Sequence, residues 1–97
     1  MTKSREIRTK ILKIMDLALK ISPPEKTREE HEPNAFVEYN AHVNMITVRC
    51  FKYGDYHGRA DYEASIYMDE ICANEKLDET IEYLRNLREE INNVSKN

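Results

Sequence analysis

The sequence predicts an α+β domain of order α-β-β-β-α, in which a three-stranded antiparallel meander carries both helices on one face. Three observations support this prediction. Residues 35–53 alternate between apolar and polar side chains, residues 60–68 do the same, and apolar residues near both ends of the chain recur at spacings of three and four. A chain of 97 residues is large enough for one hydrophobic core but not for two. We therefore expect residues 1–97 to form a single domain.

The first helix is expected to be capped by Ser4 and to end at residues 22–24, because the two prolines there remove donors and disfavour helix before them. Its apolar positions at helical spacing are Ile7, Ile11, Ile14, Met15, Ala18 and Ile21. Leu12, Leu17 and Leu19 widen the apolar face beyond what one side of a small sheet needs. This surplus is expected to be covered either by the second helix or by another copy of the chain.

The alternating run over residues 35–53 is expected to fold into a β-hairpin whose register follows from its side chains. Successive strand residues point to opposite faces, so one face collects the apolar partners. The expected core-face pairs are Ala41–Ile46, Tyr39–Val48 and Val37–Cys50. The expected pairs on the other face, each contributing about 0.2–1 kcal/mol, are Glu38–Arg49, Asn40–Thr47 and Phe36–Phe51. A two-residue turn would put the β-branched Val43 at positive φ, so we expect a four-residue loop over residues 42–45.

Residues 60–68 are expected to form the third strand, whose clean alternation implies one solvent-facing side. Its core side would carry Tyr62, Ala64, Ile66 and Met68. Asp69 is then expected to cap the final helix, with Glu70 and Glu75 at the positive end of the helix dipole. The apolar positions of this helix are Ala73, Leu77, Ile81, Leu84, Leu87 and Ile91.

Three segments are expected to lie outside the regular elements. Residues 22–34 alternate in charge without periodicity, which indicates a solvated loop. Loops of this length are either functional or disordered, and we favour a plain connection here. Residues 54–59 form a turn-rich link bracketed by glycines. Residues 92–97 are expected to be a frayed tail.

Because both helices are expected on one face of the sheet, the other face is left open and is the candidate interaction surface. Its candidate residues are Phe36, Glu38, Asn40, Thr47, Arg49, Phe51, Glu63 and Tyr67, and Ser65 lies among them. Aromatic and charged side chains on a sheet can bind a protein or stack nucleic-acid bases. Glu38 and Glu63 beside Arg49 disfavour nucleic acid. Two interpretations remain: an ion-pair ladder that only stabilises a half-exposed sheet, which is the simpler, and a protein interface, self-association included.

No residue pattern in the sequence points to catalysis, a metal or a cofactor. His31, His42 and His57 are expected in loops or at a turn, without further ligand residues at metal-binding spacing. Cys50 falls on the expected core face and Cys72 near a helix start, which is typical of reduced structural thiols. We therefore expect a protein that is not an enzyme and holds no cofactor or metal.

Charge is distributed unevenly along the chain, which suggests two alternative functions. Residues 1–21 hold six Lys or Arg and two acids, whereas residues 69–97 hold four and eight. The acidic final helix, through Asp78, Glu79 and Glu82, would imitate the phosphates of DNA and block a DNA-binding host enzyme. The basic first helix would bind nucleic acid weakly, with an affinity that falls steeply with salt.

The chain is expected to stay in the cytoplasm without a membrane partner. Its first residues, MTKSREIRTK, are charged where a signal peptide needs an apolar run. No stretch approaches the about 18 apolar residues of a membrane span.

The order α-β-β-β-α is similar to that of the double-stranded-RNA-binding domain, a family with a basic cluster at the start of its second helix. Here the corresponding residues 69–75 read DEICANE. Phosphate contacts supply most of the affinity in such complexes, so this acidic start argues against RNA binding. The similarity is therefore one of topology alone.

Short strings over most of the chain resemble small proteins of unknown function that are encoded by phages and prophages of Gram-positive bacteria. These strings are Phe36-Val37-Glu38-Tyr39, His42-Val43-Asn44, Val48-Arg49, Ile66-Tyr67-Met68-Asp69 and Glu82-Tyr83-Leu84. The resemblance implies a phage accessory protein in the cytoplasm of the bacterial host and brings no active site with it. We expect a non-enzymatic protein that acts through protein contacts on the open sheet face or the helix edge, including association into a homodimer.

Overall fold

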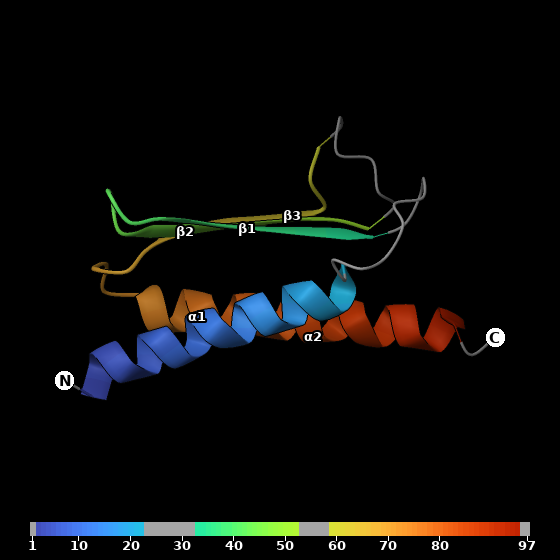
Figure 1. Ribbon diagram of the computed structural model, residues 1–97, viewed down its shortest axis with the longest axis horizontal. Helices are drawn as coiled ribbons and strands as arrows, with labels where there is room; N and C mark the ends of the chain where they lie inside the picture. Colours follow the sequence, from blue (N-terminus) through green and yellow to red (C-terminus); the bar gives the residue numbers. More distant parts are fainter. Residues whose placement is uncertain (1, 23–32, 53–58, 96–97) are drawn as a thin grey trace.

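The computed structural model describes residues 2–22, 33–52 and 59–95, which form two helices and one three-stranded sheet (Figure 1). In chain order the elements are α1 (Thr2–Ile21), β1 (Asn34–Asn40), β2 (Met45–Phe51), β3 (Tyr62–Tyr67) and α2 (Ala73–Ser95). The strands pair antiparallel in the order β1-β2-β3. The predicted fold class and strand order are confirmed.

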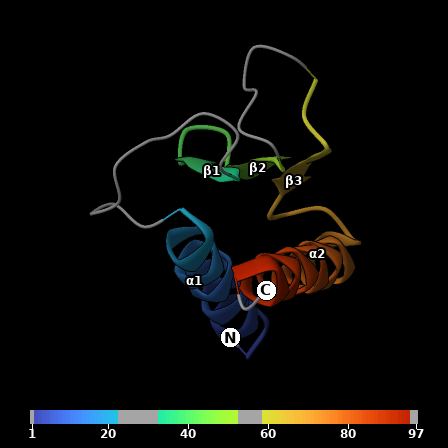
Figure 2. The ribbon, with the colours of Figure 1, turned by 90° about the vertical axis from the view of Figure 1, so that its right-hand side faces the viewer.

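Both helices lie on the same face of the sheet, as Figure 2 shows, with α1 beneath β1 and α2 beneath β3. They run side by side in the same direction, antiparallel to β1 and β3 (Figure 1). No helix of the described residues covers the opposite face of the sheet.

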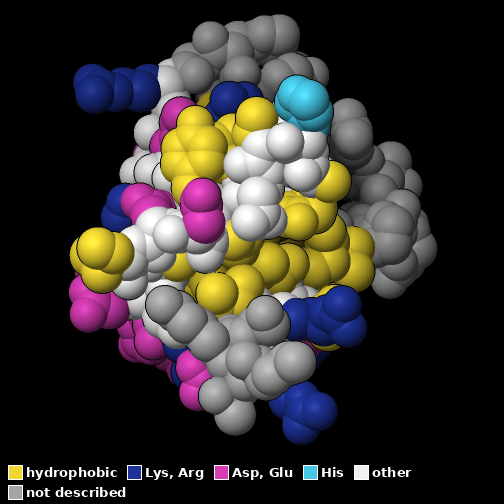
Figure 3. Space-filling view, turned by 90° about the vertical axis from the view of Figure 1, so that its left-hand side faces the viewer, with side chains coloured by type: hydrophobic (Ala, Val, Ile, Leu, Met, Phe, Trp, Pro, Cys, Tyr) yellow, Lys and Arg dark blue, Asp and Glu magenta, His cyan; other side chains and the backbone are white. Residues whose placement is uncertain are grey.

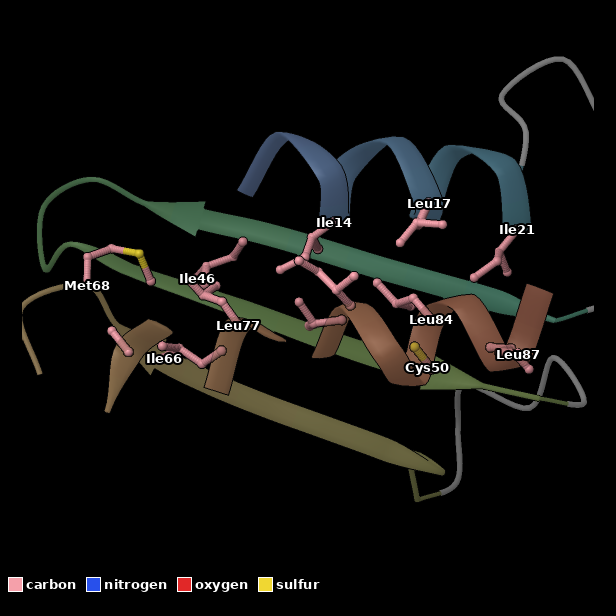
Figure 4. Close-up of a cluster of buried hydrophobic side chains, with 13 residues drawn as sticks. Ile14, Leu17, Ile21, Ile46, Cys50, Ile66, Met68, Leu77, Leu84 and Leu87 are labelled. Atoms are coloured by element: carbon pink, nitrogen blue, oxygen red, sulfur yellow. The ribbon is translucent and has the colours of Figure 1, made fainter. Parts of the chain in front are cut away.

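The hydrophobic core fills the space between the sheet and the two helices (Figure 4). Its fully buried side chains include Ile14 of α1, Ile46, Val48 and Cys50 of β2, Ile66 of β3, and Leu77 and Leu84 of α2. Burying one such aliphatic side chain contributes about 1.5–3 kcal/mol to stability. Because β2 is the central strand, its inner face lies wholly inside this core.

The predicted hairpin register is wrong by two residues. The observed core-face pairs are Ala35–Cys50, Val37–Val48 and Tyr39–Ile46. The four-residue loop covers residues 41–44 instead of 42–45, because Asn44 takes a positive φ of 53° and its N–H donates to the Ala41 carbonyl at 3.3 Å. Asparagine adopts this left-handed conformation more readily than most residues. A shift of two preserves the faces, so the inward and outward sets survive the error.

Three hairpin side chains have a different exposure from the one predicted. Tyr39 points to the helix side but is 52% exposed, and Ala41 lies in the exposed turn. Tyr39 lines a groove between the first half of α1 and this end of the sheet, so its ring is only partly covered. Phe51, expected on the open face, is only 7% exposed, because its ring packs edge-on against Phe36 with centroids 5.5 Å apart.

Several element ends also differ from the predictions. α1 begins at Thr2, so Ser4 lies within its first turn, and β3 is shorter than the expected run over residues 60–68. α2 begins at Ala73 and not after Asp69, because residues 68–72 form turns in which the Ala73 N–H donates to the Glu70 carbonyl at 3.2 Å. α2 continues to Ser95, which corrects the tail predicted over residues 92–97. Residues 23–32 of the predicted loop and 54–58 of the predicted link lie outside the described residues.

Candidate interaction surfaces

The open sheet face is built from three rows of side chains that run across the strands. The rows are Phe36–Arg49–Glu63, Glu38–Thr47–Ser65 and Asn40–Met45–Tyr67. Within them, the Arg49 Nε lies 3.8 Å from a Glu63 carboxylate oxygen, and the Thr47 and Ser65 hydroxyls lie 3.4 Å apart. Glu38 lies opposite Thr47 and not opposite Arg49, as a consequence of the shifted register.

Two of the eight predicted surface residues have little area to offer a partner. Thr47 is 8% exposed and Phe51 is 7% exposed, so both act as packing within the face. The six that remain exposed are Phe36, Glu38, Asn40, Arg49, Glu63 and Tyr67. Arg49 pairs with Glu63 and Phe36 packs against Phe51, so several side chains of this face contact one another.

A second surface runs along α1, on the side turned away from α2. Leu12, Met15 and Leu19 are 62%, 40% and 47% exposed, and their spacing of three and four places them in one row, here called the outer stripe. Leu17, by contrast, is 2% exposed and belongs to the core. Of the three surplus leucines predicted on this helix, Leu17 is buried in the core, whereas Leu12 and Leu19 stay exposed.

A groove of about 530 Å³ with a mixed apolar and charged lining opens where the first half of α1 meets the end of the sheet. It is lined by Ile7, Arg8, Ile11, Leu12, Tyr39, Asn44, Met68 and Asp69. Figure 3 shows apolar side chains gathered over this end of the molecule, with basic side chains beside them. The Tyr39 hydroxyl donates to the Asn44 side-chain oxygen at 3.2 Å, which holds the ring at the mouth of the groove.

The outer edge of β1, the edge that no other strand pairs with, lies on the same side of the molecule as the outer stripe of α1. The Met68 N–H donates to the Asn44 carbonyl, so even-numbered residues of β2 bond to β3 and odd-numbered ones bond to β1. On β1 the even-numbered residues therefore bond to β2, and Ala35, Val37 and Tyr39 direct their backbone groups outward. The Ala35 N–H donates to the Ser22 hydroxyl at 3.0 Å. No described residue bonds to the outward groups of Val37 and Tyr39, here called the open edge.

The acidic face of α2 is partly neutralised by the chain itself. Asp78 lies 3.0 Å from the Lys10 ammonium, Glu90 lies 3.7 Å from that of Lys52, and the Glu70 carboxylate that precedes the helix binds Lys76 at 3.0 Å. The basic face of α1 is reduced in the same way, since Lys10 is engaged by α2. These pairs weaken the two charge-based alternatives, DNA mimicry by α2 and nucleic-acid binding by α1.

The titratable residues that the structure describes do not assemble into a reactive site. Cys50 is fully buried, and burial, followed by the nearby Asp61, raises the pKa of its thiol to about 12. Such a thiol is a poor nucleophile. Cys72 is exposed, His42 lies in the exposed turn, and His31 and His57 fall outside the described residues. Within the described ranges, no group of three or more His, Cys, Asp or Glu residues could hold a metal ion.

Tyr83 has a buried hydroxyl for which the described residues supply no hydrogen-bond partner. Its ring stacks on Tyr62 at 4.2 Å, and burial raises the pKa of its phenol to about 12. The Tyr62 hydroxyl, in contrast, lies 2.9 Å from the Thr80 hydroxyl. Of the two stacked tyrosines, therefore, Tyr62 has a hydrogen-bond partner for its hydroxyl and Tyr83 has none among the described residues.

Comparison of the chain with protein-family models, with curated proteins and with solved structures yields no match. Among the described residues, no helix has the length and apolar character needed to cross a membrane. The surfaces must therefore be interpreted from their own geometry.

The groove and the open edge could not be located from the sequence, because both depend on how the helix end meets the turn. The outer stripe left a signal, since Leu12, Met15 and Leu19 recur at three and four residues. Helical spacing groups Met15 with the main apolar positions and Leu17 with the surplus, whereas in the structure Met15 is exposed and Leu17 is buried.

Proposed function

We propose that this chain is a non-enzymatic accessory protein that acts through protein–protein contacts, consistent with its resemblance to small phage-encoded proteins. The contact surface is the side of the molecule formed by the outer stripe of α1, the groove beside it and the open edge of β1. We call this side the β1 flank.

The observation that carries the proposal is the exposure of three large apolar side chains in one row beside unpaired strand backbone. Leu12, Met15 and Leu19 lose the hydrophobic stabilisation of burial at about 25 cal/mol per Å² left in water. A partner that covers them recovers this free energy. Contiguous apolar patches on a small protein mark interaction sites more often than scattered single residues do.

The β1 flank is a better contact surface than the open sheet face for a physical reason. On the sheet face, Arg49 pairs with Glu63 and Phe36 packs against Phe51, so part of that face has contacts within the chain. On the β1 flank, the outer stripe and the open edge have no described partners to lose. The sheet face stays a prediction for the weaker of the two surfaces.

Capture experiments with matched variants test the proposal. The tagged chain with Leu12→Ser and Leu19→Ser is compared with one carrying Phe36→Ser and Tyr67→Ser, which removes two exposed rings from the sheet face. We expect the leucine pair to abolish binding of the captured protein, a second copy included, while the aromatic pair retains it. Circular dichroism confirms that both variants fold. Loss of binding only in the aromatic pair would move the contact surface to the sheet, and retention by both would reject the proposal.

A further inference from the structure

We infer that the β1 flank binds an extended segment of a partner protein, which adds to the sheet as a further strand beside β1. This inference rests on the proposed function and names the kind of partner that it requires. The segment runs antiparallel to β1, because both strand pairs of this sheet are antiparallel and such pairing is slightly more stable per residue. Strand addition takes its affinity from backbone hydrogen bonds and its specificity from alternate side chains.

The open edge determines where the segment pairs. Val37 and Tyr39 direct their N–H and carbonyl groups outward, so each exchanges two hydrogen bonds with the segment residue opposite it. At Ala35 the Ser22 hydroxyl already accepts from the outward N–H, so the segment does not continue past Val37 in that direction. The core of the pairing is therefore short and comprises the segment residues opposite Val37, Glu38 and Tyr39.

The two hydrogen-bonded residues of the segment carry apolar side chains. Residues opposite each other in a sheet share a face, and Val37 and Tyr39 point to the helix side. Tyr39 lines the groove together with Leu12, so the segment residue opposite Tyr39 lies beside this exposed leucine. Covering Leu12 removes its apolar surface from water, which favours binding.

The outer stripe also lies level with the second apolar position. The Ser22 hydroxyl and the Ala35 N–H are hydrogen-bonded, so these two residues lie at the same height along the sheet. Val37 lies two strand residues further, about 6.6 Å, which corresponds to about four residues of the antiparallel helix and to the level of residue 18. Met15 and Leu19 flank this level, so the segment residue opposite Val37 packs over them.

The residue between the two apolar positions is basic. It lies opposite Glu38 on the open sheet face, in a non-hydrogen-bonded pair, where side chains approach most closely. Glu38 is exposed and has no ion-pair partner among the described residues, since Arg49 pairs with Glu63. Opposite charges directly across a strand pair are favourable and like charges are not. The segment therefore reads apolar, basic, apolar in one extended stretch.

An extended strand accounts for both features of the flank at once. A helix laid along the outer stripe would cover the apolar side chains, but its own N–H and carbonyl groups are bonded within it. It would bring no backbone groups to Val37 and Tyr39. A strand satisfies these outward groups and covers the stripe with alternate side chains.

An NMR titration of the isotope-labelled full chain tests the inference, with the capped peptide acetyl-Ser-Ile-Lys-Ile-Ser-amide as the probe. We expect the amide signals of Val37 and Tyr39 to move as peptide is added. Their hydrogen exchange should slow about fivefold when most sites are occupied. The amides of Phe36 and Glu38, which are bonded to β2, should change less. No change at Val37 and Tyr39 at millimolar peptide would overturn the inference.

N-methylated peptides provide matched controls that leave the protein unchanged. A methyl group on either isoleucine nitrogen removes a donor to the open edge, so we expect the dissociation constant to rise about tenfold. The lysine nitrogen points away from β1, so methylating it should change the dissociation constant about twofold or less. Equal effects of the two kinds of methylation would overturn the inference, because the peptide would not be paired at this edge.

Reversal of one charge on each side tests the basic position. Glu38→Lys is expected to raise the dissociation constant of the lysine peptide about fivefold, because like charges then face each other. The peptide with glutamate in place of lysine should bind this variant better than it binds the unmodified chain. Glu38 is exposed, so the variant is expected to fold. Indifference of both peptides to the substitution would overturn the assignment of a basic residue.

The captured protein itself is tested with two variants of one residue. Tyr39→Pro removes an outward N–H and leaves the bonds between β1 and β2 intact, because an edge strand tolerates proline at such a position. Tyr39→Ala removes the ring and keeps the N–H. We expect the proline variant to release the captured protein and the alanine variant to retain part of it, with circular dichroism confirming that both fold.

The outcomes separate this inference from the proposed function. A chain that loses its captured partner on Leu12→Ser and Leu19→Ser, but keeps it on Tyr39→Pro and shows no change with the peptide, keeps the proposed function and overturns strand addition. A chain that binds the peptide at Val37 and Tyr39, yet keeps its captured partner in the leucine variant, supports strand addition at this edge and overturns the proposed function.

Discussion

Each edge of the sheet is an edge strand with a helix beneath it, but the side chains that border the two edges differ. On the α2 side, the Tyr67 N–H of β3 donates to the Glu70 carboxylate at 3.1 Å, and Glu63 adds a second acid to that edge. On the α1 side, Val37 and Tyr39 have no described partners for their outward groups, and the outer stripe lies below them. The β3 flank carries acidic side chains at its edge, whereas the β1 flank carries a row of exposed apolar side chains.

This difference shows how a small sheet can limit its own association. Exposed strand edges attract further strands, and natural proteins protect them with charged side chains or local caps. Here each edge has one local cap: the Glu70 carboxylate accepts from the Tyr67 N–H, and the Ser22 hydroxyl accepts from the Ala35 N–H. Under the proposed function we expect contacts at the β1 edge and not at the β3 edge, because Glu63 and Glu70 make the β3 edge less favourable for a further strand.

The largest expected effect separates the two sides of α1. Leu17→Ala is expected to lower the free energy of unfolding by about 2–5 kcal/mol, because it leaves a cavity in the core. Leu19→Ala, two residues along and half exposed, is expected to cost about 0.5 kcal/mol or less in the monomer. Urea unfolding at low protein concentration measures both values. Equal losses would mean that the outer stripe supports the fold and is not a free surface.

A smaller effect concerns the turn that borders the groove. Asn44→Ala is expected to destabilise the fold by about 1–2 kcal/mol, because residue 44 must hold a positive φ. Asn44→Gly keeps that conformation and loses only the contact with the Tyr39 hydroxyl, so its stability should stay close to that of the unmodified chain. Thermal unfolding compares the two variants. If both lose stability equally, the side-chain bond and not the backbone angle holds the turn.

The smallest effects distinguish the stacked rings on the α2 side. Tyr62→Phe removes the hydroxyl that meets Thr80 and is expected to cost about 0.5–1.5 kcal/mol. Tyr83→Phe removes a buried hydroxyl without a described partner, so we expect stability to rise by about 1 kcal/mol. Chemical denaturation with a common slope resolves the opposite signs. A loss of stability in Tyr83→Phe would show that its hydroxyl is bonded after all.

The spacing of apolar residues in the sequence is sufficient to predict the order of the elements and most of the core residues. Val48, Cys50 and Ile66 lie inside as predicted, because strand alternation depends only on adjacent residues. The register failed because it depends on one turn residue, Asn44, whose backbone angle the apolar pattern does not specify. The start of α2 was missed for a similar reason, since Glu70 caps the strand before it and not the helix.

The candidate site was only partly accessible to sequence reasoning. The surplus leucines of α1 were identified, but which of them the fold covers depends on the rotation of the helix against the sheet. Thr47 and Phe51 were assigned to the correct face and yet are buried, because neighbouring side chains on that face close over them. The spacing of residues along a strand determines which face a side chain lies on, but the packing of its neighbours determines how much of it is exposed.

The parallel course of the two helices determines how the protein can be attached to a surface. α1 begins at the end of the molecule that carries the groove, and α2 ends at the opposite end (Figure 1). An anchor joined after α2 therefore holds the molecule with its groove directed into solution, whereas one joined before α1 crowds it. Immobilised probes or imaging fusions of this chain should be built on the far end.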